Sequence, residues 1–237
     1  MTTYRHPVIA LSTSKGGAGK TTMSIALAAV FADWGYRIAM IDTDPQQSLM
    51  DWSLKPGKPE FIDVFSAEDE DVLIDLIEAC KKSHQITLID VQGRVSELGN
   101  TAMAWADLVL IPVQASAFDA AGASNTIATI RRVERARRTE IPFSTVLNRV
   151  PAAIASRTLL SVREAFDESG IEILTSLVDR EAYRVMTAAG GTIYTLDKSQ
   201  APGLDKAKLE CETLAIAVSA KLGLIDPADA DIEQELA

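Results

Sequence analysis

The chain alternates short runs of consecutive apolar residues with longer segments in which apolar residues recur at helical spacing. The runs predict strands at residues 8–11, 37–41, 61–65, 86–90, 108–113, 143–147 and 171–174. The longer segments predict helices at 21–34, 117–138, 157–168 and 204–222, and an acidic helix that ends near residue 82. Strands that are apolar throughout are typical of a parallel sheet covered on both faces. The pattern therefore predicts an α/β fold with a single doubly wound, mostly parallel sheet and helices on both faces.

Length and composition are those of an ordinary globular domain, with 237 residues, 47% of them hydrophobic and 24% charged. We expect one domain over residues 1–225 and a flexible acidic tail over residues 226–237. No apolar run approaches the ~18 residues that a membrane-spanning helix needs. Residues 1–7 are polar and do not resemble a secretory signal.

Charge is distributed unevenly along the chain, whose formal net charge is −10. Residues 60–78 contain eight acidic residues and no basic one, and residues 226–237 contain five acidic residues and no basic one. The rest of the chain contains 23 basic and 20 acidic residues. A net negative charge argues against nucleic acid as a partner, but this distribution weakens the argument because the remainder is slightly basic.

Cysteine and histidine are too sparse for a structural metal site. Cys80 and Cys211 lie far apart in helical patterns, and no CxxC motif occurs. His6 and His84 are the only histidines, and neither has the spacing of a metal ligand. We expect two buried thiols in a reducing cytoplasm, with no zinc and no disulfide.

A glycine-rich segment, KGGAGKTT at residues 15–22, connects the first predicted strand to the first predicted helix. Its glycines allow backbone N–H groups to approach phosphate oxygens, and the N-terminus of the helix adds a partial positive charge. Lys20 is placed to contact the β- and γ-phosphates, and the Thr21 hydroxyl to bind Mg²⁺. The residues expected to bind the nucleotide here are Gly16, Gly17, Ala18, Gly19, Lys20, Thr21 and Thr22. The alternative, a glycine turn without a ligand, does not account for this order of strand, loop and helix, and no dinucleotide motif G-x-G-x-x-G is present.

KGGAGKTT resembles the deviant Walker A motif of the ParA/MinD superfamily of P-loop ATPases, whose mark is an additional lysine, here Lys15. The resemblance covers residues 8 to about 222. It implies an ATPase domain that binds ATP and Mg²⁺, forms a homodimer when ATP is bound, and hydrolyses ATP slowly. It also implies that Lys15 reaches the phosphates of the other subunit, where a cation offsets developing charge. The catalytic residues implied are Lys15, Lys20 and Asp44.

Acidic residues follow two of the predicted strands. By resemblance, Asp42 supports the Mg²⁺ shell and Asp44 positions the attacking water, although an N-cap for a short following helix is the alternative. Asp90 ends the fourth predicted strand as a Walker B residue and, with Asp42, would hold Mg²⁺ through water. The family usually continues with one residue and two prolines, whereas this chain has Val91-Gln92-Gly93, which puts the coupling of this segment to hydrolysis in doubt. Gly93 is expected to offer its N–H to the γ-phosphate.

Asn148 follows the sixth predicted strand. By resemblance it would hydrogen-bond the adenine base, and an ordinary turn residue is the alternative. The chain shows no N-terminal helix-turn-helix extension, which indicates the short ParA type. Its acidic tail differs from the basic membrane helix of MinD-like proteins, so we expect no membrane partner. Residues 93–101 also resemble ParA-like proteins of the Agrobacterium VirC operon, which assist T-DNA transfer.

Basic residues are grouped in two regions that we expect to contact DNA. On the last predicted turns of the helix at 117–138, three arginines share a face: Arg131, Arg135 and Arg138. Toward the C-terminus the candidates are Arg180, Arg184, Lys198, Lys206 and Lys208, and also Lys221. Solvated helix faces are the alternative for both groups.

The sequence therefore predicts a nucleoid-associated ParA-type ATPase that binds DNA non-specifically. Such a protein partitions or positions plasmid, chromosomal or other cargo, with hydrolysis stimulated by a ParB-like or other small adaptor. Three alternatives remain open: a ParA-like factor in conjugative or T-DNA transfer, a small-molecule P-loop ligase or kinase, and a regulator that binds only proteins.

Overall fold

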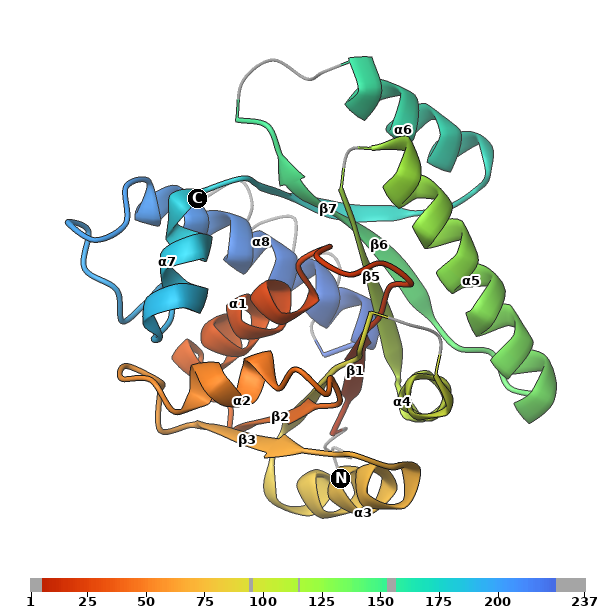
Figure 1. The fold of residues 1–237 in the computed structure, drawn as a ribbon, viewed down its shortest axis with the longest axis horizontal. Helices are drawn as coiled ribbons and strands as arrows, with labels where there is room; N and C mark the ends of the chain where they lie inside the picture. Colours follow the sequence, from red (N-terminus) through yellow and green to blue (C-terminus); the bar gives the residue numbers. More distant parts are fainter. Residues whose placement is uncertain (1–5, 94–95, 115, 153–156, 225–237) are drawn as a thin grey trace.

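The computed structural model describes residues 6–93, 96–114, 116–152 and 157–224. In these residues seven parallel strands form one sheet in the order β3-β2-β4-β1-β5-β6-β7 (Figure 1). The strands are β1 (Val8–Leu11), β2 (Ile38–Asp42), β3 (Ile62–Ser66), β4 (Ile86–Asp90), β5 (Leu108–Gln114), β6 (Phe143–Val150) and β7 (Ile173–Val178). The predicted α/β fold is confirmed. The predicted acidic tail at 226–237 lies outside the described residues.

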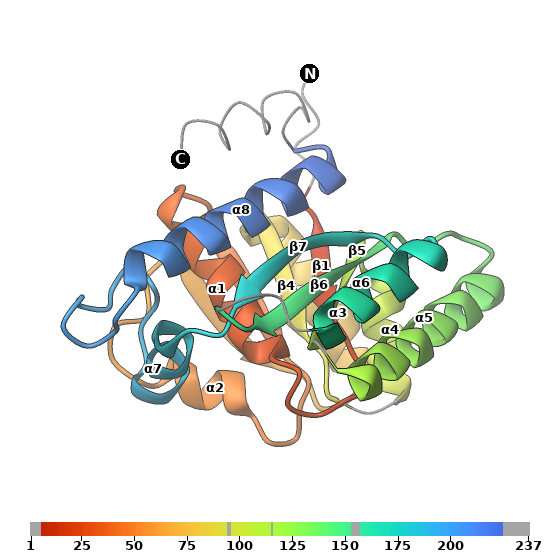
Figure 2. The same ribbon diagram turned by 90° about the horizontal axis from the view of Figure 1, so that it is seen from above.

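Helices cover both faces of the sheet (Figure 2). They are α1 (Lys20–Asp33), α2 (Ser48–Ser53), α3 (Glu70–Ser83), α4 (Glu97–Trp105), α5 (Ala117–Arg137), α6 (Arg157–Glu168), α7 (Glu181–Ala189) and α8 (Leu204–Leu222). One core lies under α1, α2, α7 and α8, and the other under α3 to α6. Alternate residues of β1 enter opposite cores, Ile9 the first and Ala10 the second, because successive side chains of a strand point to opposite faces. No helix of the described chain is long and apolar enough to span a membrane.

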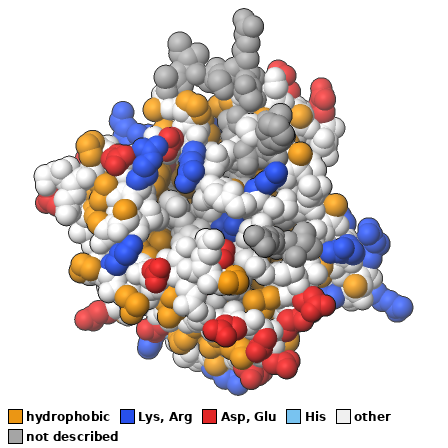
Figure 3. All heavy atoms as spheres, in the orientation of Figure 1, with side chains coloured by type: hydrophobic (Ala, Val, Ile, Leu, Met, Phe, Trp, Pro, Cys, Tyr) orange, Lys and Arg blue, Asp and Glu red, His pale blue; other side chains and the backbone are white. Residues whose placement is uncertain are grey.

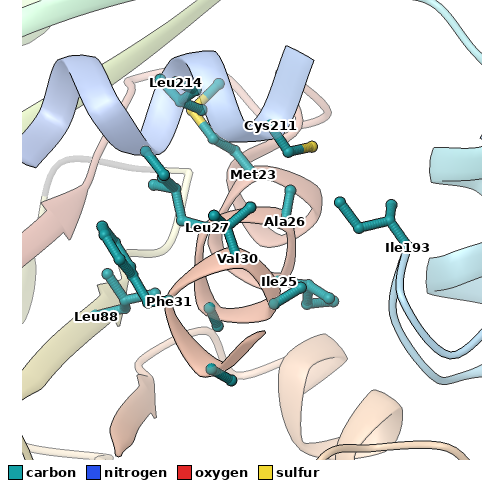
Figure 4. Packing of buried hydrophobic residues seen from close by; sticks show 14 of the residues in the cluster. Met23, Ile25, Ala26, Leu27, Val30, Phe31, Leu88, Ile193, Cys211 and Leu214 are labelled. Atoms are coloured by element: carbon teal, nitrogen blue, oxygen red, sulfur yellow. The ribbon is translucent and has the colours of Figure 1, made fainter. Parts of the chain in front are cut away.

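Helix α1 is buried on almost all sides, because the sheet covers one of its faces and α8 another (Figure 4). Leu27 and Phe31 are fully buried beside Leu88 of β4, and Met23 approaches Leu214 of α8. This explains the small, alanine-rich composition of α1, which allows close approach of its neighbours. The packing fixes the helix whose first residue, Lys20, follows the glycine-rich loop.

Helices α4 and α7 were not among the elements predicted from the sequence. Helix α4 contains Gly99 and Asn100, which have low helical propensity, and its start is stabilised by the Ser96 hydroxyl, which accepts the N–H of Gly99. Strand β7 runs to Val178, well beyond the predicted end at residue 174. Helix α5 ends at Arg137, and Arg138 follows in a left-handed conformation with φ 56°.

The order of strands reverses direction at β1, which lies between β4 and β5. The carboxyl ends of parallel strands meet at one edge, and ligands of open α/β sheets bind where the strand order reverses. In the register of the sheet, Asp90 pairs with Leu11 of β1 and with Asp42 of β2. The fold therefore brings the glycine-rich loop and both acidic segments to the same edge.

Candidate functional site

The loop between β1 and α1 adopts two left-handed turns, at Gly17 (φ 77°) and Gly19 (φ 93°). Gly19 stands at the N-cap of α1, and its carbonyl accepts the N–H of Met23. A Cβ at Gly19 would lie 2.1 Å from Nδ2 of Asn148. Glycine is therefore required here by both the backbone conformation and the space available.

Amide side chains from β5 and β6 hold the carbonyls of this loop. Asn148 Nδ2 donates to the Ala18 carbonyl at 2.7 Å, and Gln114 Nε2 donates to the Gly17 carbonyl at 2.9 Å. Asn148 Oδ1 accepts the backbone N–H of Arg149, and the residue is buried. Asn148 thus supports the loop in this structure, and its contact with adenine stays a prediction. Gln114 was not found from the sequence, because a glutamine at a strand end has no distinguishing spacing.

Asp90, Thr21 and Lys20 form a buried polar group at the base of the loop. Thr21 Oγ1 donates to Asp90 Oδ2 at 2.5 Å, whereas Asp90 Oδ1 is buried with no hydrogen-bond partner among the described residues. Burial raises the pKa of Asp90 to about 7, against the opposing effects of Thr21 and Lys20. Burial also lowers the pKa of Lys20, although Asp90 and Asp44 favour its charged form.

This buried group fits a magnesium ion. An uncompensated carboxylate oxygen beside a threonine hydroxyl is the kind of oxygen donor that Mg²⁺ prefers, with water and phosphates completing the shell. The described residues contain no cluster of three or more His, Cys, Asp or Glu side chains that would bind a metal by themselves. A metal here would therefore depend on the phosphates of a bound nucleotide for part of its coordination.

Asp42 is 1% exposed, and both of its carboxylate oxygens accept backbone N–H groups. Oδ1 accepts from Asp44 at 3.0 Å, and Oδ2 accepts from Leu49 and Met50, at 2.9 and 3.1 Å, in the first turn of α2. Burial raises the pKa of Asp42, and these N–H groups act in the opposite direction. Asp42 therefore fixes the loop that carries Asp44 to the first turn of α2, although the N-cap position itself is occupied by Gln47. Its part in the Mg²⁺ shell stays a prediction.

Asp44 faces a cleft of about 870 Å³ beside the glycine-rich loop. Its Oδ1 accepts the N–H of Gln46, and the side chain is half-buried. The cleft is bounded by the loop and the start of α1, by α2 with its preceding segment, and by Gln92 and Gly93 after β4. Arg149 of β6 and Thr187 of α7 also line the cleft. Arg149 and Thr187 were not predicted, because only the tertiary fold brings β6 and α7 to this cleft.

The segment at 91–93 packs tightly on the glycine-rich loop. A Cβ at Gly93 would lie 3.1 Å from the Gly16 Cα and from the Lys15 carbonyl oxygen. A proline at position 93, as in the family pattern, would carry such a Cβ. The glycine therefore permits a closer approach of this segment to the loop than that pattern would.

Comparison with known proteins agrees with this geometry. A family model described as VirC1 protein matches residues 7–224. The chain belongs to the VirC1 family. This VirC1-family chain is 31% identical over 217 residues to Protein ParA of Rhizobium radiobacter, covering 91% of this chain and 97% of that protein. It is 27% identical over 191 residues to Protein virC1 of Rhizobium rhizogenes, covering 77% and 80% respectively. The predicted short ParA type with VirC likeness, within the ParA/MinD superfamily of P-loop ATPases, is thus confirmed.

Solved structures share the fold at low sequence identity. An ATP complex of a Cyanothece McdA variant superposes with a TM-score of 0.75 at 16% identity, covering 90% of this chain and 96% of that one. The MinD cell division protein of Aquifex aeolicus superposes with a TM-score of 0.70 at 20% identity, covering 88% and 96%. The VirC1-family chain therefore has the fold of P-loop ATPases of the ParA/MinD type.

The predicted DNA-contacting residues of this VirC1-family chain differ in how far their charges are already neutralised. Toward the C-terminus, Arg180 pairs with Glu210, and Arg184 pairs with Asp179 and Glu181. Lys198 pairs with Asp205, Lys221 pairs with Glu172, and Lys208 lies over the ring of Tyr194. Lys206 is exposed, and in the described chain no ion pair holds it.

The arginines at the end of α5 are less constrained. Arg131 pairs with Glu134 and lies over the ring of Phe143. Within the described ranges, no carboxylate lies within ion-pair distance of the exposed residues Arg132, Arg135, Arg137 and Arg138. Arg138 lies beyond the helix, so the expected shared helical face extends only from Arg131 to Arg135. Figure 3 shows Lys and Arg side chains gathered over this end of α5, and Asp and Glu side chains over α3.

Proposed function

We propose that this VirC1-family protein is an ATPase that dimerises on ATP, binds DNA non-specifically, and partitions or positions plasmid, chromosomal or other DNA cargo. The observation that carries the proposal is the buried Asp90 oxygen without a partner, beside Thr21 and Lys20 and below a loop with preformed left-handed turns. This arrangement offers a cation site and a phosphate site at one position. A nucleoside triphosphate with bound Mg²⁺ would occupy both.

Different groups of the chain have different roles in ATP binding and hydrolysis. Backbone N–H groups of the loop and the N-terminus of α1 hold the phosphates, and Lys20 places its charge beside the β- and γ-phosphates. Thr21 and Asp90 would hold Mg²⁺, which supplies charge neutralisation on the phosphate oxygens when bound. Asp44, which lines the same cleft, orients the attacking water. Asp42 keeps Asp44 in place by accepting hydrogen bonds from the backbone N–H groups of Asp44 and of Leu49 in α2.

Dimerisation is supported by the direction of Lys15. Its side chain is exposed and contributes nothing to the lining of its own cleft. A cation held outside its own site is available to the phosphates of a second copy, as the resemblance to the deviant Walker A motif implies. ATP would thereby join two copies, and a small adaptor of the ParB kind would stimulate turnover.

DNA binding is supported best by the unpaired arginines at the end of α5. Arg184 would lose its ion pairs with Asp179 and Glu181 on meeting phosphates. The arginines without such pairs would not, and these are Arg132, Arg135, Arg137 and Arg138. Contacts of this kind are independent of base sequence and weaken steeply with salt. They would bring the ATP-bound protein to the nucleoid.

The test separates turnover from binding. We expect Asp44→Ala to bind ATP as the parent does, to retain DNA in the presence of ATP, and to lose at least about 100-fold in kcat. Asp51→Ala is the matched control, because Asp51 lines the same cleft but is exposed and belongs to α2 rather than to the loop that carries Asp44. Equal turnover in Asp44→Ala and the parent protein would show that Asp44 does not position water.

A second candidate is assistance to conjugative or T-DNA transfer, favoured by the VirC1 match over residues 7–224. The ATPase cycle would be the same, and the cargo would be the transferred DNA. Retention of DNA in the presence of ATP at low salt is common to both candidates. Its absence would instead favour a P-loop enzyme that acts on a small molecule.

A further inference from the structure

Gly122 stands inside helix α5, where a glycine costs stability relative to alanine. Its neighbours Ala121 and Ala123 show that small helix-forming residues are accepted on both sides. A Cβ at Gly122 would lie 2.7 Å from Cγ of Lys15 and 3.6 Å from Cε. The missing side chain therefore leaves a space, the Gly122 gap, that the stem of Lys15 occupies.

The start of the glycine-rich loop is fixed to the same turn of α5. The Gly122 carbonyl accepts the Ser14 hydroxyl at 3.0 Å and the Thr126 hydroxyl at 2.9 Å. Thr126 Oγ1 in turn accepts the backbone N–H of Ser14 at 3.0 Å. On the other side, Gly93 packs against Lys15 and Gly16. The backbone of Lys15 is thus held between α5 and the segment after β4, so its side chain leaves in a defined direction.

That direction is away from the cleft formed by the same loop. Gly16, Gly17, Gly19, Lys20 and Thr21 line the cleft, and Lys15 does not. The Lys15 ammonium is therefore held outside the cleft formed by its own loop.

We infer that Gly122 is a positioning residue for Lys15: the Gly122 gap directs the Lys15 ammonium outward, toward the phosphates in the cleft of a second copy of this chain. The inference rests on the proposed ATP-dependent dimer. Gly122 itself touches neither nucleotide nor metal, and it acts only through the lysine. An alanine at this position would favour the helix and at the same time displace the Lys15 stem.

The kinetic test compares Gly122→Ala, Lys15→Ala and the double variant with the parent protein. We expect Gly122→Ala to lower kcat about tenfold or more with little change in the affinity for ATP, since a misplaced catalytic group lowers rate rather than ground-state binding. The double variant should be no slower than Lys15→Ala alone, because both changes remove the same contribution. Losses that add in the double variant, or a kcat unchanged or raised in Gly122→Ala, would overturn the inference.

Ala128→Ser is the matched control, since it adds one atom to the exposed face of the same helix. It should leave kcat and the melting temperature unchanged. Gly122→Ala should melt no lower than the parent, which excludes unfolding as the cause of its slower turnover.

A second readout needs neither ATP nor dimer. Lysines are labelled by reductive ¹³C-methylation, and the Lys15 resonance is assigned from its absence in Lys15→Ala. In nucleotide-free protein this resonance should shift in Gly122→Ala and stay in place in Ala128→Ser. An unshifted Lys15 resonance in Gly122→Ala would overturn the inference. A parent protein without ATP turnover would contradict the proposed function, and the resonance would still decide the role of Gly122.

Discussion

Asp90 and Lys20 are both buried, and burial displaces the pKa of each toward its neutral form. Their mutual attraction offsets only part of the loss of hydration, which is the usual balance for buried charges. A site of this kind is destabilising while empty and becomes favourable when a cation and phosphates enter. The free energy of nucleotide binding therefore includes relief of this unfavourable burial.

The first prediction concerns the pH dependence of stability in nucleotide-free protein. The pKa of Asp90 is raised from an ordinary value near 3.8 to about 7, so the folded state binds the proton more tightly than the unfolded state. Stability should therefore fall as the pH rises from about 4 to about 7, and Asp90→Asn should remove this loss. At pH 8 we expect Asp90→Asn to be more stable than the parent by on the order of 4 kcal/mol, given about 1.4 kcal/mol for each of roughly three pKa units.

Melting temperatures measured by calorimetry from pH 5 to pH 8 check this prediction. The difference between the two proteins should shrink toward pH 5, because Asp90 is then protonated in the folded parent. A constant difference across this range would contradict the role of Asp90 ionisation. Asp90→Asn should also lose Mg²⁺-dependent ATP binding, since an amide is a weaker ligand than a carboxylate.

Sequence patterns were sufficient to place these residues, because the glycine-rich loop, Lys20 and Thr21 are contiguous and Asp90 ends an apolar strand. They were insufficient for residues whose role depends on a distant neighbour. Gln114 contacts the Gly17 carbonyl across 97 positions, and Gly122 receives the Ser14 hydroxyl across 108. No local spacing encodes such contacts, so only the fold shows them.

At the scale of elements, α5 and α7 present arginines of different kinds. Arg184 of α7 pairs with Asp179 and Glu181. Arg180, which directly precedes α7, pairs with Glu210. Those at the end of α5 are exposed and largely without carboxylate partners in the described chain. The sequence could not separate the two sets, because the carboxylates on Arg180 and Arg184 come partly from other elements.

The corresponding prediction is that α5 provides most of the contacts to DNA. Arg135→Ala and Arg138→Ala should each weaken DNA binding of the ATP-bound protein and reduce the slope of log K against log salt by about 1. Arg184→Ala should leave the slope nearly unchanged. Fluorescence anisotropy with a labelled duplex over a series of salt concentrations measures both quantities. The reverse ranking would assign the DNA surface to α7.

Element boundaries followed the strength of the local signal. Long helices with clear spacing, α1 and α8, were predicted to within a residue or two of their ends. Helix α4 was missed, because its glycine and asparagine favour turns and its stability comes from packing on α3 and α5. Helix α7 was missed because nine residues give only about two turns of apolar spacing.

At the scale of the whole molecule, the net charge of −10 is made of separate parts. Acidic side chains lie over α3, and basic side chains lie over the end of α5 (Figure 3). A further five acidic residues belong to residues 226–237. A polyanion approaching α5 therefore meets a local positive field that the acidic parts weaken over distances of about one Debye length.

We therefore predict that removal of residues 226–237 strengthens DNA binding at low salt by a few fold, and that the effect disappears at high salt. The control keeps the length and replaces the five acids with amides, which should reproduce the effect of removal. Affinities at the two salt concentrations, measured with ATP and Mg²⁺, check the prediction. Equal affinities of the full and shortened chains at low salt would show that these acids do not act on DNA binding.

The two hydrogen bonds that side-chain amides donate to the glycine-rich loop have a thermodynamic consequence. Because Asn148 and Gln114 already hold the Ala18 and Gly17 carbonyls, the backbone is ordered before a ligand arrives. Loading of nucleotide should then involve little loss of conformational entropy, and titration calorimetry would show binding without a large entropic penalty. A protein loaded so readily is best controlled at later steps, in the pairing of subunits and the release of phosphate, rather than by access to nucleotide.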